Sequence, residues 1–184
     1  QDQGERLYAM ACDVGDVESC VDLAELVLDR DGPRSLALYD QACDGGYYYA
    51  CVQQGVDLLL GGGVEADPAR GVERLKLACE GGEPRGCATL ATAYLSGIGV
   101  TADTGAAVGL YERACEADDG YACGSLGTLY SLGQGVERDL TRASDLFARG
   151  CNAGSAIACG NLGWMHVSGL GVPEDRDGGV ALLQ

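Results

Sequence analysis

Residues 115–151 read CEADDGYACGSLGTLYSLGQGVERDLTRASDLFARGC and contain one complete unit of an internal repeat. Two cysteines stand eight positions apart at its start, and the next copy opens 36 residues after the first. The chain holds five such pairs: Cys12 with Cys20, Cys43 with Cys51, Cys79 with Cys87, Cys115 with Cys123, and Cys151 with Cys159. A fixed period of about 20 to 50 residues is typical of units that bury their apolar faces by stacking on their neighbours.

Each unit is expected to form two amphipathic helices. In the first, which we call the A helix, apolar or small residues follow the second cysteine at i+3, i+4 and i+7: Leu126, Gly127 and Tyr130 after Cys123, and Leu162, Gly163 and His166 after Cys159. This spacing places them on one helix face, and the small residue at i+4 lets a neighbouring helix approach closely. The second, or B helix, repeats the spacing in Ala143, Leu146, Phe147, Gly150 and Cys151.

The connection between the two helices carries its own signals. The A helix is expected to stop at a glycine loop, which recurs as 61–64, 97–100, 133–136 and 169–172 and ends each time in valine. Glycine supplies the left-handed turn that ends a helix. Three residues after each valine stands an aspartate that can cap the B helix: Asp67, Asp103, Asp139 or Asp175. Pro68, directly after Asp67, fits the first helical position.

The cysteines of a pair end one B helix and begin the next A helix, so a turn must lie between them. Within a single helix, residues i and i+8 would be about 12 Å apart, too far for a disulfide. A turn-forming residue stands three positions after each first cysteine: Gly15, Gly46, Gly82, Asp118 and Gly154. Five disulfides, each within a pair, are the favoured interpretation. Free core thiols are an alternative, and zinc fits poorly because seven residues separate the cysteines and His166 is the single histidine.

Composition narrows the possible partners and compartments. The formal net charge is −16, with 12 basic and 28 acidic residues, which disfavours nucleic-acid binding and favours a basic or neutral partner. No run of 18 or more apolar residues suggests a membrane span. Persistent disulfides would imply an oxidising compartment such as the periplasm or the cell exterior.

These motifs resemble the Sel1-like repeat, a relative of the tetratricopeptide repeat, in Leu126-Gly127, Tyr130, the 133–136 loop and Asp139. The seven-residue spacer between cysteines resembles the disulfide-rich branch typified by the Helicobacter cysteine-rich proteins. The resemblance implies an all-α, right-handed α/α solenoid that is secreted or periplasmic and binds other molecules. It also implies, as an alternative function, weak β-lactamase or penicillin-binding activity. A more distant resemblance to a mitochondrial assembly factor implies a redox or haem-handling role, with His166 as the ligand.

We expect a single array over residues 1–184. Residues 1–12 are expected to end a preceding B helix, and the approximate units are 13–43, 44–79, 80–115, 116–151 and an incomplete 152–184. The first unit spans 31 residues and has Asp31-Gly32-Pro33 at its connection in place of the glycine-valine loop. In the second, Gln54 replaces the usual leucine and Leu58 the tyrosine, which predicts less regular packing.

Catalysis finds little support in the sequence. His166 occupies the repeat's tyrosine position, where a core role is the simpler interpretation. Lys76 has Glu73 rather than serine three positions before it, so the Ser-x-x-Lys motif of serine β-lactamases is missing. The adjacent carboxylates Asp118 and Asp119 are expected to be solvated loop charges. No cofactor or metal is predicted.

Binding is the favoured function, because a solenoid presents an extended concave surface lined in related arrays by A helices. The candidates lie two and five positions after each second cysteine: Asp22, Glu25, Gln53, Val56, Thr89, Thr92, Ser125, Thr128, Asn161 and Trp164. Trp164 is the strongest, since tryptophan is enriched at binding hot spots, although packing between repeats is the alternative. Tyr47, Tyr48 and Tyr49 are further candidates, because three consecutive tyrosines in a turn cannot all be buried. The expected partner is a protein or peptide.

Overall fold

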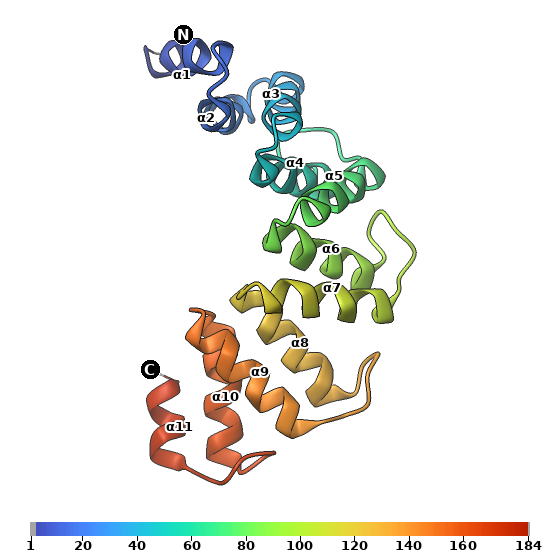
Figure 1. Cartoon of the computed structure of the whole chain (residues 1–184), viewed down its shortest axis with the longest axis vertical. Helices are drawn as coiled ribbons and strands as arrows, with labels where there is room; N and C mark the ends of the chain where they lie inside the picture. Colours follow the sequence, from blue (N-terminus) through green and yellow to red (C-terminus); the bar gives the residue numbers. More distant parts are fainter. Residues whose placement is uncertain (1–2, 184) are drawn as a thin grey trace. The chain divides into compact units, whose positions relative to one another are not determined.

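The computed structural model describes residues 3–183, which form eleven α-helices and no strand (Figure 1). The helices are α1 (Gln3–Asp13), α2 (Val17–Val27), α3 (Gly32–Asp44), α4 (Tyr48–Leu60), α5 (Pro68–Glu80), α6 (Pro84–Ser96), α7 (Thr104–Glu116), α8 (Gly120–Leu132), α9 (Leu140–Asn152), α10 (Ala156–Ser168) and α11 (Arg176–Leu182). The predicted all-α α/α solenoid fold is confirmed. None of the helices in this range is both long and apolar enough to cross a bilayer.

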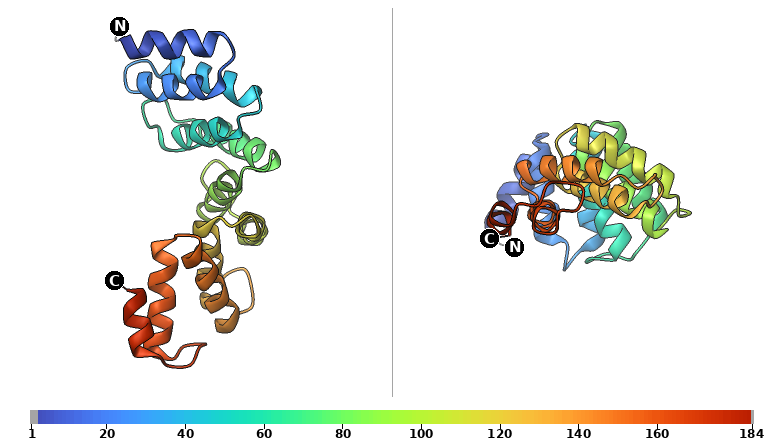
Figure 2. Two further views of the ribbon diagram at one scale, coloured as in Figure 1. Left: turned by 60° about the vertical axis from the view of Figure 1, so that its left-hand side comes forward. Right: turned by 90° about the horizontal axis from the view of Figure 1, so that it is seen from below.

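The helices belong to two compact units. The first contains α1–α6 and ends at Ala102, and the second begins at Asp103 and contains α7–α11. Inside each unit every helix packs against the next one in sequence, as the further views in Figure 2 show. The A helices α4 and α6 also contact each other in the first unit, and α8 contacts α10 in the second. Each unit is therefore a stack of helical hairpins with A helices side by side.

The hairpin turns between the cysteines of a pair have the predicted geometry. Gly15, Gly46, Gly82 and Gly154 have φ between 87° and 95°, and Asp118 has φ of 59°. These positive φ values reverse the chain after each B helix. The reversal brings the two cysteines of each pair to a Cα–Cα distance of 4.5 to 5.1 Å.

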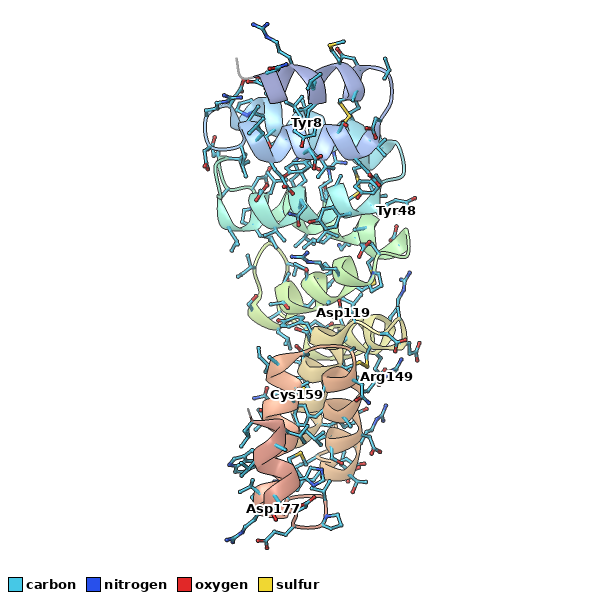
Figure 3. The ribbon with its side chains drawn as sticks, turned by 90° about the vertical axis from the view of Figure 1, so that its left-hand side faces the viewer. Tyr8, Tyr48, Asp119, Arg149, Cys159 and Asp177 are labelled. Carbon is cyan, nitrogen blue, oxygen red and sulfur yellow. A yellow bond between two sulfur atoms is a disulfide. The ribbon has the colours of Figure 1, made fainter. Side chains whose placement is uncertain are left out.

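All ten cysteines form disulfides, and none is free. Every bridge joins residues eight positions apart, in the predicted pairing, so the alternative of free core thiols is wrong. Figure 3 draws the bridges as yellow bonds and labels Cys159 in α10. The bridges are Cys12 with Cys20, Cys43 with Cys51, Cys79 with Cys87, Cys115 with Cys123, and Cys151 with Cys159.

The second cysteines of the first two pairs are as deeply buried as those of the regular repeats. Cys20 in α2 and Cys51 in α4 are both 0% exposed, although they belong to the two units that depart from the repeat. The irregular loop after α2 and the polar residue Gln54 therefore leave the bridges of these units unchanged.

The connections from A to B helices also follow the prediction. Gly61, Gly97, Gly133 and Gly169 end the A helices in the left-handed conformation. Asp67, Asp103, Asp139 and Asp175 each accept a hydrogen bond from a backbone N–H in the first turn of the next helix. A further bond closes the loop, because the N–H of the capping aspartate donates to an A-helix carbonyl: Asp67 to Leu58, Asp139 to Tyr130 and Asp175 to His166, at 2.9 to 3.0 Å.

The small residue at i+4 allows close packing of A on B helices. A Cβ on Gly127 would come within 2.8 Å of the Phe147 ring, and one on Gly163 within 2.7 Å of the Gly179 carbonyl oxygen. Contacts below about 3 Å leave no room for a methyl group. Glycine at this position therefore sets the distance between the two helices.

The N-terminal region departs from the repeat, as the short first unit predicted. The residue that caps the end of α2, Leu28, is right-handed and takes the place of a left-handed glycine, although Asp31 still caps α3. Glu5 of α1 is only 2% exposed, and it accepts hydrogen bonds from Arg30 (2.6 Å) and Arg34 (2.7 Å). The Arg34 hydrogen bond is the largest cause that lowers the pKa of the Glu5 carboxyl.

Gln54 is the second departure. Its side chain is fully buried, and its Nε2 donates to the Leu36 carbonyl (3.1 Å) and to Asp40 (2.9 Å). Asp40 in turn forms ion pairs with Arg70 and Arg74. The Gln54 Oε1 atom is buried without a hydrogen-bond partner among the described residues. A polar network thus occupies a place where the other units have a leucine.

Candidate binding faces

The structure places all ten predicted A-helix residues on α2, α4, α6, α8 and α10. Asp22, Glu25 and Trp164 are exposed, and the others are half-buried: Gln53, Val56, Thr89, Thr92, Ser125, Thr128 and Asn161. The hydroxyl groups of Thr89, Thr92 and Thr128 donate to carbonyls one turn earlier in their own helices. These threonines therefore offer mainly an acceptor oxygen and a methyl group to a ligand.

In the first unit, α2 and α4 form an acidic face. Gln53 Nε2 of α4 donates a hydrogen bond of 3.5 Å to Glu25 Oε1 of α2, and this bond links the two helices. Asp57 lies one turn after Gln53, and its Oδ2 atom is buried without a hydrogen-bond partner within residues 3–183. Burial raises the pKa of Asp57 to about 6, and the negative charge of Glu25 adds to the shift. The carboxylates of Glu25 and Asp57 thus repel each other.

The three consecutive tyrosines are all half-buried and point to two different places. The rings of Tyr47 and Tyr49 lie 6.0 Å apart at the start of α4. Burial raises the pKa of Tyr47, and the charges of Glu18 and Asp22 on α2 contribute, so Tyr47 borders the acidic face. The Tyr48 ring instead covers Gly81, where an added Cβ would clash with it. Tyr47 and Tyr49 are therefore placed with the candidates of α2, and Tyr48 is not.

In the second unit, α8, α9, α10 and the loops that follow α8 and α10 enclose a groove of about 280 Å³. Its lining residues are Thr128, Ser131, Leu132, Arg138, Leu140, Phe147, Asn161, Trp164, Met165 and Leu170. We call this cavity the α8–α10 groove. It brings together three of the predicted candidates, Thr128, Asn161 and Trp164. Leu132 and Trp164 are 60% and 57% exposed, so the groove has apolar walls that are open to solvent.

The loop after α8 positions the only charged residue in that lining. The left-handed turn at Gly133 folds the chain back so that the Arg138 backbone lies against it. Arg138 Nε then donates to the Ser131 carbonyl at 2.9 Å. This bond fixes one edge of the guanidinium group at the rim of the groove and leaves its terminal nitrogens without a carboxylate partner in the described chain.

Basic residues are distributed unevenly between the two kinds of helix. Arg85, in the first turn of α6, is the only Lys or Arg in the five A helices. The B helices carry most of the others, and several form ion pairs between neighbouring B helices, as Arg70 does with Asp40 and Arg142 with Glu112. The Arg142 guanidinium also lies 4.2 Å over the Tyr130 ring. Cationic side chains therefore stabilise the B-helix stack and are nearly absent from the A helices.

The residues considered for catalysis are dispersed. His166 is half-buried in α10, and its Nδ1 has no hydrogen-bond partner among residues 3–183. Glu73 and Lys76 are exposed on α5, in the other unit. Asp118 pairs with Arg149 at 2.9 Å, and Asp119 caps α8. Within the described range no three His, Cys, Asp or Glu side chains come together as a metal site would require.

Sequence reasoning missed Leu132, Arg138 and Leu170 in the groove. A signal was available, since the residues equivalent to Arg138 in the other loops are Ala66, Ala102 and Glu174. The A-helix candidates were chosen by their distance from the second cysteine, so no residue of the loops that follow the A helices was among them. The loop folds onto the A helices, so its side chains contribute to the same surface.

Comparison with known proteins agrees with this architecture. The Sel1 repeat family model matches residues 22–47, 49–83, 84–119, 120–155 and 156–184. Among solved structures, a Sel1 repeat protein from Oxalobacter formigenes shares 26% identity and a TM-score of 0.85, over 97% of this chain and 53% of that one. Helicobacter pylori cysteine rich protein B shares 28% identity and a TM-score of 0.60, over 73% of this chain and 96% of that one.

A protective antigen of uropathogenic Escherichia coli has the same fold, with 24% identity and a TM-score of 0.84 over 97% of this chain. The chain spans 39% of the length of that antigen and 53% of the Oxalobacter protein. No curated protein sequence matches it. The five matched segments cover almost all of residues 22–184, and the chain belongs to the Sel1 repeat family.

Proposed function

We propose that this chain is a non-enzymatic scaffold that binds protein or peptide partners through its A helices. The observation that carries the proposal is the α8–α10 groove, in which a largely exposed tryptophan stands among apolar walls on the A-helix side of the second unit. Exposed tryptophans next to apolar pockets are frequent anchors of binding energy. A rigid stack of hairpins holds such an anchor in place without a conformational cost on binding.

The first unit supports a different kind of contact. Its α2–α4 face carries Glu18, Asp22, Glu25 and Asp57, and neither helix contains a Lys or Arg. A partner segment with basic side chains would relieve the repulsion between these carboxylates. The borders of this face, Tyr47 and Tyr49, add aromatic surface suited to Arg or Lys side chains.

The five disulfides support a location outside the reducing cytosol, such as the periplasm or the cell exterior. Disulfides of this number persist where the thiol pool is oxidised. The hairpins formed by helices α1 to α10 would then keep their disulfides while the protein binds its partner.

Selection of a random peptide library displayed on phage, carried out on the oxidised protein, tests the proposal. We expect selected peptides to fall into two groups. Peptides of one group should bind the Trp164→Ala variant at least tenfold more weakly than the wild-type protein. Peptides of the other group should bind the Glu25→Gln variant at least tenfold more weakly. Ile157→Ala, an exposed apolar residue of α10 outside the groove, and Glu80→Gln are the matched controls and should change affinity less than twofold. Recovery of no binding peptide, or of peptides insensitive to both test variants, would contradict the proposal.

A further inference from the structure

We infer that the α8–α10 groove binds a peptide segment in which a bulky apolar side chain lies next to a carboxylate. The inference rests on the proposed peptide-binding function and specifies the chemistry of one site. It differs from the expectation for the chain as a whole, whose net charge of −16 favours basic partners.

The apolar part of the segment is indicated by the walls of the groove. Leu140, Phe147 and Met165 form its inner side, and Leu132 and Trp164 form its open edges. A volume of about 280 Å³ lies just below the usual range for small-molecule sites, so it suits one side chain better than a complete organic ligand. Burial of a Phe or Leu side chain there removes both it and the exposed edges from water.

The carboxylate is indicated by Arg138. Among residues 3–183, no acidic side chain lines the groove, and Arg138 is the only charged residue in its lining. Three other arginines of the second unit are already paired: Arg142 with Glu112, Arg149 with Asp118 and Arg176 with Glu174. The bond from Arg138 Nε to the Ser131 carbonyl restricts the guanidinium group and leaves its outer nitrogens available. A guanidinium group held in this way matches the two oxygens of a carboxylate.

The neighbouring acidic residues Glu137 and Asp139 are not among the residues that line the groove. They line an adjoining hollow with Tyr130 and Arg142, and Arg138 borders both cavities. Asp139 Oδ1 also accepts a hydrogen bond from the backbone N–H of Arg142 at 2.9 Å. Arg138 is therefore the charged side chain that borders the groove itself.

Only one pair of neighbouring repeats has this combination. The residues equivalent to Arg138 in the other glycine loops are Ala66, Ala102 and Glu174, and those equivalent to Trp164 in the other A helices are Glu25, Val56, Thr92 and Thr128. The apolar anchor and the cation therefore occur together at a single place in the array. This supports a specific site rather than a general property of the repeat surface.

Four capped peptides of the form acetyl-Gly-Ser-X-Y-Ser-Gly-amide test the inference, with X-Y as Phe-Asp, Phe-Asn, Phe-Lys or Ala-Asp. Trp164 is the only tryptophan of the chain, so its fluorescence reports directly on occupancy of the groove. We expect Phe-Asp to bind most tightly, Phe-Asn about tenfold more weakly, and Phe-Lys and Ala-Asp more weakly still.

Two variants at exposed residues separate the contribution of the carboxylate from that of the apolar side chain. Arg138→Gln should bind Phe-Asp and Phe-Asn equally, while Leu132→Ser should weaken both without removing the preference for aspartate. Equal or tighter binding of Phe-Lys by the wild-type protein would overturn the inference. So would no response to any of the four peptides. If phage selection then still yields peptides sensitive to Glu25→Gln, the scaffold function stands and only the assignment of this groove fails.

Discussion

Gly127 of α8 lies directly beneath the ring of Phe147 of α9. A Cβ atom at Gly127 would come within 2.8 Å of Phe147 Cε1 and 3.2 Å of the Ala143 carbonyl oxygen. The absence of a side chain at one residue therefore lets the aromatic ring of the other fill the space between the helices. The same contact places Phe147 at the base of the α8–α10 groove.

Gly127→Ala should lower the free energy of unfolding by about 1 to 3 kcal/mol, because the added methyl group must displace Phe147 or the α9 backbone. Gly109→Ala is the matched control. Gly109 lies exposed within α7, and nothing stands within 4 Å of its ideal Cβ, so alanine there should stabilise the helix by about 0.5 to 1 kcal/mol. Urea unfolding followed by circular dichroism measures both. Equal effects of the two substitutions would contradict the close packing at Gly127.

Removal of the Cys79–Cys87 bridge by alanine at both positions should cost about 2 to 3 kcal/mol, since the bond closes a loop with a sequence separation of 8. Both sulfurs lie in the core, where alanine is accommodated without a polar group. The control is the same comparison in the presence of a strong reductant, which opens the bridge in the wild-type protein as well. With reductant present, the difference in urea midpoint between the wild type and the double alanine variant should shrink to the effect of the altered packing alone. A difference that is unchanged by reductant would contradict the assigned role of the bridge.

Asp57→Asn should make stability less dependent on pH. Burial raises the pKa of Asp57 from its ordinary 3.8 to about 6, so the folded state binds this proton more tightly than the unfolded state. The stabilisation is complete below about pH 4 and is lost as the pH rises through 6. Above pH 7 the variant should therefore be more stable than the wild type by about 1 to 2 kcal/mol, a figure reduced for the solvent screening of a half-buried group.

The two proteins should converge in thermal unfolding near pH 4. Glu73→Gln, which removes one exposed negative charge from α5, is the control and should not reproduce this convergence. A wild-type protein that is more stable than Asp57→Asn at pH 8 would contradict the absence of a partner for Asp57.

Local chemistry made most of the fold predictable. The turn residues three positions after each first cysteine, the capping aspartates and the small residues at i+4 all work within one repeat, and each has the predicted geometry. The buried Glu5 was not predicted, because its partners Arg30 and Arg34 are 25 and 29 residues away. The groove was missed for a related reason: it depends on where a loop between two helices folds in three dimensions.

Gln54→Leu should raise the free energy of unfolding by about 1 kcal/mol. Leucine is the residue at the equivalent positions Leu90, Leu126 and Leu162, and the substitution removes the buried, unpartnered Oε1 atom. Asp40 keeps its two arginine partners after the amide is lost. Gln53→Leu, one position earlier and half-buried on the surface, is the control and should have little effect. A lower urea midpoint for Gln54→Leu would show that the amide contributes more than it costs.

Five covalent bridges fix successive hairpins into stacks that present the A helices. Alkylation of the denatured, non-reduced protein with iodoacetamide, followed by intact mass measurement, shows whether these bridges exist. We expect no label on any of the ten cysteines, and a mass lower by ten hydrogens than that of the fully reduced chain. Protein purified from its native compartment with ten labelled cysteines would contradict the bridged structure.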